Sequence, residues 1–333
     1  MRALPGFRSA ARLAACLVFG AGCAPAAWAQ GAAEEPFPSR PVRLIIPMAP
    51  GGSSDVLARI VIPKIAAGLG QSIVIENKPG GNGLIGEEMV ARAKPDGYTL
   101  MMEPTAIAIN PSLNTPSYDA TRAFTPVSQI AAVPLILTVH SSVPAQNVKE
   151  LIELIKAKPG SYTYASFGNG SIAHFAGEMF KLAVGVDMAH IAYKGTPQAV
   201  NDTLGGQVHM MFAPVPTIVQ HFKSGKAKGL AITSPARSAL APEIPTMAEA
   251  GVSGMEVQTW FGMFLPAGAP AAIASRYHEE LLKAVRLPEV RAALDAQGFN
   301  LIASSPAEFN RVYLAEIERY RRVVRQARIK ADG

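Results

Sequence analysis

The sequence is poor in cysteine and in charge. Only two cysteines occur among its 333 residues, and both, Cys16 and Cys23, lie near its start. Without that start, the chain has no disulfide, no thiolate metal site and no cysteine nucleophile. Charged residues make up only 17%, and no block of Lys or Arg with interleaved aromatics occurs, so we expect no nucleic-acid partner. The histidines show no metal-ligand spacing, and we expect no bound metal and no cofactor.

Long apolar runs are also absent, since none reaches the roughly 20 residues that a membrane-spanning helix needs. The short apolar stretch 13–21 instead follows three basic residues, Arg2, Arg8 and Arg12, and precedes the small-residue motif Ala27-Trp28-Ala29. This organisation is typical of a secretory signal peptide. It predicts a signal peptide over residues 1–29, cleavage near Ala29 and a periplasmic location.

A lipid anchor at Cys23 is the alternative for this segment, because small residues precede that cysteine. The leucine usual at the first position of a lipoprotein signal is missing, so we favour plain cleavage. Removing the three arginines leaves 28 basic against 25 acidic residues, so the mature chain is less basic than the pI near 9.3 indicates. About 300 remaining residues exceed one typical core and predict two lobes.

Strands alternate with helices along the rest of the chain. Apolar runs predict strands over 42–46, 72–76, 98–102, 133–139, 162–165, 188–192, 208–212 and 229–233. Helices are predicted over 55–69, 84–92, 148–157, 173–183, 197–204, 217–224, 271–284, 289–297 and 306 to about 330. Pro63 lies inside the first of these, where proline kinks or splits a helix. The alternation predicts an α/β fold of mainly parallel sheets flanked by helices.

Two glycine-rich turns occupy matching places in this pattern. One, Pro47-Met48-Ala49-Pro50-Gly51-Gly52-Ser53-Ser54-Asp55, directly follows the first predicted strand. The other, Ser166-Phe167-Gly168-Asn169-Gly170-Ser171-Ile172-Ala173-His174, follows the strand 162–165. Each pattern indicates a strand, a tight turn and a helix start, which leaves unpaired N–H groups at a helix N-terminus. Two such anion sites predict a cleft that binds a negatively charged small molecule from both sides.

An ordered set of further motifs accompanies the turns. They are Phe37-Pro38-Ser39-Arg40-Pro41-Val42, Val74-Ile75-Glu76-Asn77-Lys78-Pro79-Gly80, Lys94-Pro95-Asp96-Gly97-Tyr98-Thr99-Leu100, Ile109-Asn110-Pro111, Tyr193-Lys194-Gly195, Leu204-Gly205-Gly206-Gln207-Val208 and Trp260-Phe261-Gly262. Together with the turns, this set resembles the Bug or TctC receptors, the periplasmic substrate-binding proteins of tripartite tricarboxylate transporters. The resemblance runs from residue 38 to about residue 324.

The resemblance implies a periplasmic-binding-protein fold of the type II-like, Venus-flytrap kind, without catalysis. One lobe would combine residues 37–135 with 240–333, the other would hold 136–239, and the ligand cleft would lie between them. The implied ligand is a small organic acid: a mono-, di- or tricarboxylate, or an aromatic carboxylate. The implied partner is a two-subunit membrane permease or a sensor protein, and the receptor itself would be a monomer.

The family's site, carried over to Gly51, Gly52, Ser53 and residues 168–171, together with positions beside the turns and at strand ends, gives the candidate ligand-binding residues. They are Pro50, Gly51, Gly52, Ser53 and Asp55 in the first turn, Thr105 after the third strand, Gly168, Asn169, Gly170, Ser171 and His174 in the second turn, and Tyr193. We interpret Asp55 as a helix N-terminal cap, since an uncompensated carboxylate would repel an anion. His174 either faces the ligand or orients the turn through a hydrogen bond.

Some neighbouring positions have two readings, and others depart from the family pattern. Asn110 is placed near Thr105 in the cleft, and Trp260 and Phe261 form either a ligand wall or packing between lobes. Ala213 and Pro214 replace polar residues, which alters the distal specificity pocket. Glu103 replaces a common glycine and would suit a ligand ammonium group.

An exported NAD-dependent oxidoreductase is the competing interpretation. Gly81-Asn82-Gly83-Leu84-Ile85-Gly86 spells G-x-G-x-x-G before a helix, and Glu103 follows at a ribose-binding distance. However, residues 76–80 separate the motif from its strand, and that strand is the second rather than the first. The sequence also lacks the G-x-S-x-G motif that would indicate a hydrolase.

Overall fold

The computed structural model describes residues 37–329, so the predicted signal peptide and both cysteines lie outside the described residues. The strands are β1 (Val42–Ile46), β2 (Ile73–Asn77), β3 (Thr99–Pro104), β4 (Phe124–His140), β5 (Thr163–Ser166), β6 (Ala189–Ala192), β7 (Met210–Pro214), β8 (Ala227–Ile232), β9 (Gln258–Pro266) and β10 (Asn300–Leu301). The helices are α1 (Ser53–Leu69), the short 3-10 turn η1 (Gly81–Gly83), α2 (Leu84–Ala91), α3 (Ala106–Leu113), α4 (Val148–Ala157), α5 (Ile172–Val184), α6 (Thr196–Leu204), α7 (Val215–Phe222), α8 (Ala271–Arg286), α9 (Pro288–Ala296) and α10 (Pro306–Ala327).

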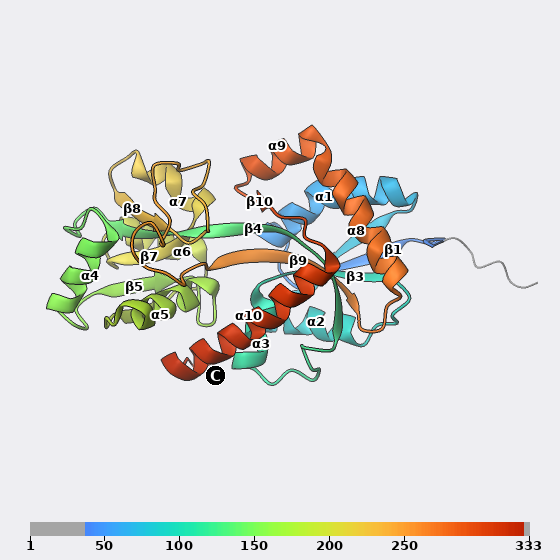
Figure 1. Ribbon diagram of the computed structural model, residues 1–333, viewed down its shortest axis with the longest axis horizontal. Coiled ribbons are helices and arrows are strands. Elements are labelled where there is room, and N and C mark those ends of the chain that lie inside the picture. Colours follow the sequence, from blue (N-terminus) through green and yellow to red (C-terminus); the bar gives the residue numbers. More distant parts are fainter. Residues whose placement is uncertain (1–36, 330–333) are drawn as a thin grey trace, which may run out of the picture. The chain divides into compact units, whose positions relative to one another are not determined.

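The strands form a sheet in the order β2-β1-β3-β9-β4-β7-β5-β6, with β8 and β10 also paired to β4 (Figure 1). Pairing is parallel between β1, β2 and β3, and again between β5, β6 and β7. These are the two βα series that the sequence predicts. The antiparallel strands β4 and β9 stand between them.

Strand β4 belongs to both halves of the sheet. Its residues 124–134 pair with β9, whereas 135–140 pair with β7 and β8. The predicted strand over 133–139 covers mainly the second part, and Pro126 interrupts the sequence pattern of the first. The pairing changes partners at Pro134/Leu135, next to the predicted lobe boundary at 135/136. The division into two lobes stays a prediction.

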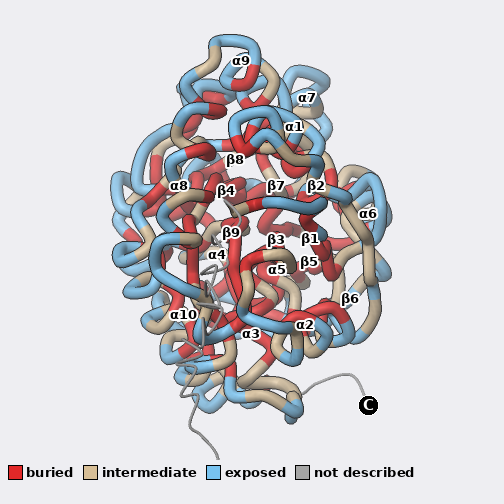
Figure 2. The backbone as a smooth tube through the Cα atoms, turned by 90° about the vertical axis from the view of Figure 1, so that its right-hand side faces the viewer, coloured by how far each residue is buried: buried red, intermediate tan, exposed pale blue. Residues whose placement is uncertain are grey.

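The core lies along the strands, and the exposed positions lie mainly on the helices and loops (Figure 2). Helix α10 shows how a helix covers the sheet. Its buried residues Phe309, Tyr313, Ile317 and Tyr320 recur at helical spacing and form one apolar stripe. The stripe packs against Trp260 and Phe264 of β9, so these two aromatics of β9 belong to the core.

Helix α1 carries the first glycine-rich turn at its N-terminus. It continues unbroken through Pro63, which is exposed, so the carbonyl that lacks a partner there can be solvated. The helix ends at Gly70, which caps it as predicted. Within the part of the chain that is described, no helix is long and apolar enough to cross a membrane.

Candidate ligand-binding site

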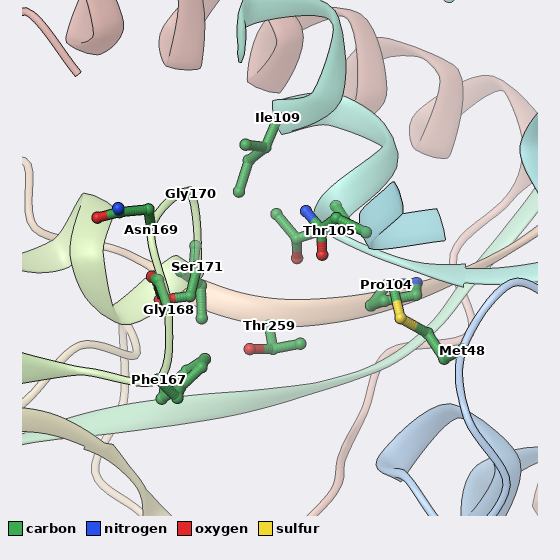
Figure 3. A pocket seen from close by; sticks show the side chains of 13 residues that line it. Met48, Pro104, Thr105, Ile109, Phe167, Gly168, Asn169, Gly170, Ser171 and Thr259 are labelled. Carbon is green, nitrogen blue, oxygen red and sulfur yellow. Dashed lines mark hydrogen bonds between the residues drawn. The ribbon is translucent and has the colours of Figure 1, made fainter. Parts of the chain in front are cut away.

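A cavity of about 210 Å³ lies where the second glycine-rich turn meets the ends of β3 and β9. Figure 3 shows Phe167 and the turn 168–171 on one side of this cavity and Thr105 on the other. The lining residues are Met48, Asn82, Pro104, Thr105, Ala106, Ile109, Phe167, Gly168, Asn169, Gly170, Ser171, Ile172 and Thr259.

A second cavity of about 340 Å³ adjoins the first and is lined in part by the first glycine-rich turn. The two share Met48, Pro104, Phe167 and Thr259. The second is also lined by Ala49, Gly52, Ser53, Ser54, Val133, Thr196, Pro214 and Phe261. None of the lining residues of either cavity carries a charge. An anion here would therefore be held by backbone dipoles, hydroxyls and amides.

The first turn is closed by its own carboxylate. The N–H of Gly51 donates to Asp55 Oδ2 at 3.0 Å, and Arg59 forms an ion pair with the same carboxylate at 2.8 Å. The hydrogen bond from Arg59 lowers the pKa of Asp55, so this carboxylate is ionised. The interpretation of Asp55 as the helix cap was wrong, because Gly52 occupies the N-cap position and receives no side-chain bond. Asp55 holds the turn that precedes the helix.

The N-terminus of α1 keeps free donors beside the second cavity. The N–H groups of Ser53, Ser54 and Asp55 have no hydrogen-bond partner among residues 37–329. They are the first-turn amides that a helix cannot satisfy itself. Ser53 and Ser54 line the cavity, so the amides of these two residues are available to a bound anion.

The second turn is closed in a similar way by a histidine. The N–H of Gly170 donates to His174 Nδ1 at 3.2 Å, and Ser171 Oγ donates to the carbonyl of Gly168 at 2.6 Å. Ser171 is the N-cap of α5 and accepts from the N–H of His174. His174 thus orients the turn through a hydrogen bond, which is one of the two roles predicted for it.

The free donors of this turn lie one step further along the chain than predicted. The N–H groups of Gly168, Gly170 and Ser171 are all donated within the turn. Those of Ile172 and Ala173, at the start of α5, have no partner among the described residues. Both residues are buried, and a buried N–H needs a partner. The helix start, rather than the glycines, therefore keeps the N–H groups that have no partner in the described chain.

Helix α3 adds a feature that sequence reasoning missed. Thr105 precedes it, and its hydroxyl accepts from the N–H of Trp260 at 2.8 Å, which ties the end of β3 to β9. Ala106, the first residue of α3, lines the first cavity, and Thr196, the first of α6, lines the second. Four helices, α1, α3, α5 and α6, thus begin at the two cavities. The sequence signal for the start of α3 was a polar residue directly after a strand, as at Thr105.

The predicted site residues divide into two groups. Gly52, Ser53, Thr105, Gly168, Asn169, Gly170 and Ser171 line one of the two cavities. Pro50, Gly51, Asp55, His174 and Tyr193 line neither. Burial, together with a hydrogen bond to Asp202, raises the pKa of Tyr193 to about 12, so its phenol stays protonated. Lining residues not in the prediction include Met48, Asn82, Ile109 and Thr259.

The G-x-G-x-x-G motif covers a buried acid pair rather than a nucleotide site. A side chain at Gly83 would lie 2.6 Å from Glu103 Oε1 and 3.0 Å from Glu87 Oε1. Glu103 is fully buried, and neither of its carboxylate oxygens has a hydrogen-bond partner within residues 37–329. It therefore presents no carboxylate to a ribose or to a ligand ammonium. Asn110, expected in the cleft, is also buried and bonded to Glu87 at 2.8 Å.

Helices that begin at uncharged cavities at the ends of the strands define a small-molecule binding protein. The chain matches the model of the tripartite tricarboxylate transporter family receptor over residues 57–329. This protein therefore belongs to the TctC family of periplasmic solute-binding receptors, and the resemblance drawn from its motifs is confirmed. Its α/β architecture is the periplasmic-binding-protein fold.

Relatives and solved structures agree with this assignment. The chain is 33% identical to protein BugT of Bordetella pertussis over 317 residues, which cover 94% of this chain and 97% of BugT. A structure of R. palustris Rpa4515 with adipate is 32% identical, with a TM-score of 0.75, over 88% of this chain and 99% of that one. MatC of Rhodopseudomonas palustris with bound malate is 29% identical, with a TM-score of 0.72, over 86% and 100% of the chains.

Proposed function

We propose that this protein is a periplasmic receptor that binds a small organic acid in the two adjoining cavities and passes it to a membrane permease. It turns no substrate over and works as a monomer. The signal peptide predicted over residues 1–29 supports export, and the family's transport role supports a two-subunit permease as the partner.

The observation that carries this proposal is the set of helix N-termini around an uncharged space. Free amides of Ser53 and Ser54 on α1 and of Ile172 on α5 belong to residues that line the cavities, and the free amide of Ala173 follows directly. A carboxylate accepts such amides without an opposite full charge. The two relatives whose structures contain adipate and malate support a carboxylate in particular.

Calorimetric titration of the exported protein with organic acids tests the proposal. Malate, adipate, succinate and an aromatic acid form the panel, after partial unfolding and refolding to remove any carried ligand. We expect stoichiometric binding of at least one acid, which is recovered chemically unchanged. Binding of none of them, or conversion of one, would overturn the proposal.

Proline substitutions locate the binding site in the same experiment. Ser53 is the first residue of α1, where proline fits a helix and removes only an N–H that has no intrahelical partner. The preceding Gly52 has ψ 169°, which a following proline tolerates. We expect Ser53→Pro to weaken binding more than Ser53→Ala, which removes the hydroxyl and keeps the amide. Equal affinities of the two variants would exclude this amide from the site.

A further inference from the structure

Asn82 lies in the loop between β2 and α2 and contributes a polar side chain to the lining of the first cavity. It has φ 54° and ψ 37°, a left-handed conformation that asparagine adopts more readily than most residues. Its Nδ2 donates to Asn110 Oδ1 at 3.2 Å. The cavity wall therefore holds an asparagine whose carboxamide is fixed by a second asparagine.

The direction of that hydrogen bond is set from deeper in the protein. Asn110 Nδ2 donates to Glu87 Oε1 at 2.8 Å and to the carbonyl of Asn82 at 3.0 Å. The carbonyl of Asn82 can only accept, so Asn110 must turn its NH₂ toward this carbonyl and Glu87, and its oxygen toward Asn82 Nδ2. Asn82 must in turn present its NH₂ to Asn110. The orientation of both amides follows from these two acceptors, Glu87 Oε1 and the carbonyl of Asn82.

The surroundings explain why Glu87 loses its proton more readily than Glu103. Tyr118 donates its hydroxyl to Glu87 Oε2, so both oxygens of Glu87 accept hydrogen bonds. Glu103 receives none. In the described part of the chain, the titratable groups around this pair are all acids or phenols, with no cation among them. They are Glu87, Glu88, Glu103, Tyr118, Asp119 and Tyr313. Two neighbouring carboxylates without a cation cannot both ionise, so Glu103 keeps its proton.

We infer that Asn82 is a specificity-determining residue that donates an amide N–H to an oxygen of the ligand, and that Asn110 and Glu87 are positioning residues that fix this polarity. Asn82 uses one N–H on Asn110, and the second N–H belongs to the same planar amide on the cavity wall. The site then selects a second oxygen acceptor on the ligand and disfavours a cationic group. This inference rests on the proposed function and names the ligand chemistry of the same site.

The role of Asn82 is tested by comparing the affinities for adipate and 6-aminohexanoate. At one end, adipate has a carboxylate that accepts hydrogen bonds, whereas 6-aminohexanoate has an ammonium group that donates them. Succinate and 4-aminobutanoate serve in the same way if the panel shows a four-carbon ligand. The wild-type protein should prefer the dicarboxylate. Asn82→Ala should weaken dicarboxylate binding about tenfold, the loss of roughly one hydrogen bond to a charged group. Asn82→Asp should move the preference toward the amino acid by about tenfold or more.

The positioning role is tested with two changes of Glu87. Glu87→Met removes the acceptor that orients Asn110 and should weaken dicarboxylate binding several-fold. Glu87→Gln keeps an oxygen that can accept from Asn110 and should largely restore it. A purely structural role of Glu87 would change the melting temperature and leave the affinity ratio of the two probes unchanged.

The outcomes are distinguishable from those of the proposed function. Wild-type binding of a dicarboxylate with unchanged affinity and unchanged preference in both Asn82 variants would overturn this inference and leave the receptor function standing. Failure of the wild-type protein to bind any acid in the panel would overturn the proposed function, and this inference with it.

Discussion

The N–H of Gly170 lies 3.2 Å from Nδ1 of His174 and donates to it, so a side chain on the first turn of α5 closes the loop in front of that turn. Asp55 does the same for Gly51 at the start of α1, at 3.0 Å. In both turns the glycine amide is used internally, and the amides of the helix start remain available. The two loops are thus ordered by their own sequence before a ligand arrives.

Replacement of His174 tests this internal closure. His174→Ala removes the acceptor of the Gly170 N–H, and we expect about a two- to tenfold loss of affinity, the worth of one neutral hydrogen bond. His221→Ala is the matched control, because His221 lies in the last turn of α7 and lines neither cavity. Titration calorimetry of both variants gives the result. Equal affinities would show that the turn keeps its form without the ring.

Substitution of the turn glycines tests the turns themselves. Gly51 has φ 79° and Gly170 has φ 71°, and a side chain at Gly170 would also lie 2.6 Å from Leu113 Cδ1. A left-handed conformation costs an ordinary residue about 1–2 kcal/mol. We expect Gly51→Val and Gly170→Val each to abolish binding, with Gly170→Val the less stable of the two. Unchanged affinity in both would contradict the two-turn site.

A third glycine separates strain from binding. Gly225 has φ 68° and, like Gly51, no atom within 4 Å of an added Cβ, but unlike Gly51 it belongs to neither glycine-rich turn. Gly225→Val should therefore lower the melting temperature about as much as Gly51→Val and leave ligand affinity unchanged. Affinity and melting temperature of the same samples check both points.

The hydroxyl of Thr105 should matter for stability. Thr105→Val leaves the N–H of Trp260, now bonded to this hydroxyl at 2.8 Å, buried without its partner. An orphaned buried donor costs about 1–3 kcal/mol, so we expect a clear fall in the denaturation midpoint. Thr105→Ser retains the hydroxyl and should recover most of the loss. Equal midpoints for valine and serine would show that another group satisfies this N–H.

The buried acid pair should make stability depend on pH. Burial raises the pKa of Glu87 from 4.5 to about 7, and burial beside Glu87 raises that of Glu103 further. The folded state therefore binds these protons more tightly than the unfolded chain does. The stabilising contribution of Glu87 is complete below about pH 4.5 and is lost as the pH rises through 7, and the contribution of Glu103 is lost at higher pH. Each tenfold difference in proton affinity between the folded and unfolded states corresponds to about 1.4 kcal/mol of unfolding free energy.

The variant Glu103→Met isolates this effect. It replaces a fully buried carboxyl without a partner by an apolar side chain of similar length. We expect its unfolding free energy to exceed that of the wild-type protein at pH 8 by about 1–3 kcal/mol, with a smaller difference at pH 5. Chemical denaturation at both pH values measures this. A difference that does not change with pH would mean that the pair does not titrate in this range.

The sequence predicted the βα series well, because each strand is a short apolar run and each helix has a clear start and end. Helix α4 has the predicted bounds, and Asn147 caps it through its side chain. Strand β9 was missed, since Trp260 and Phe261 were read as isolated aromatics. Helix α3 was missed because Pro111 lies inside it and only eight residues form it.

Part of the candidate site could also not be predicted from local sequence patterns. The glycine turns were placed correctly, but the direction of each N–H depends on side chains such as Asp55 and His174 that bond back into the turn. Asn82 was noticed only inside a nucleotide-binding motif. Its contact with Asn110 joins two segments 28 residues apart, and no periodicity or spacing predicts such a pair.

The pairing of β4 constrains how the chain can change in length. Leu135, Leu137 and Val139 of this strand pack into one core cluster, while Ile136 between them packs into another. A single residue inserted near Leu135 would exchange these two sets of side chains and shift the pairing with β7 and β8 at once. Evolution can therefore lengthen the surface loops of this receptor far more readily than residues 124–140, and length differences among relatives should fall outside that strand.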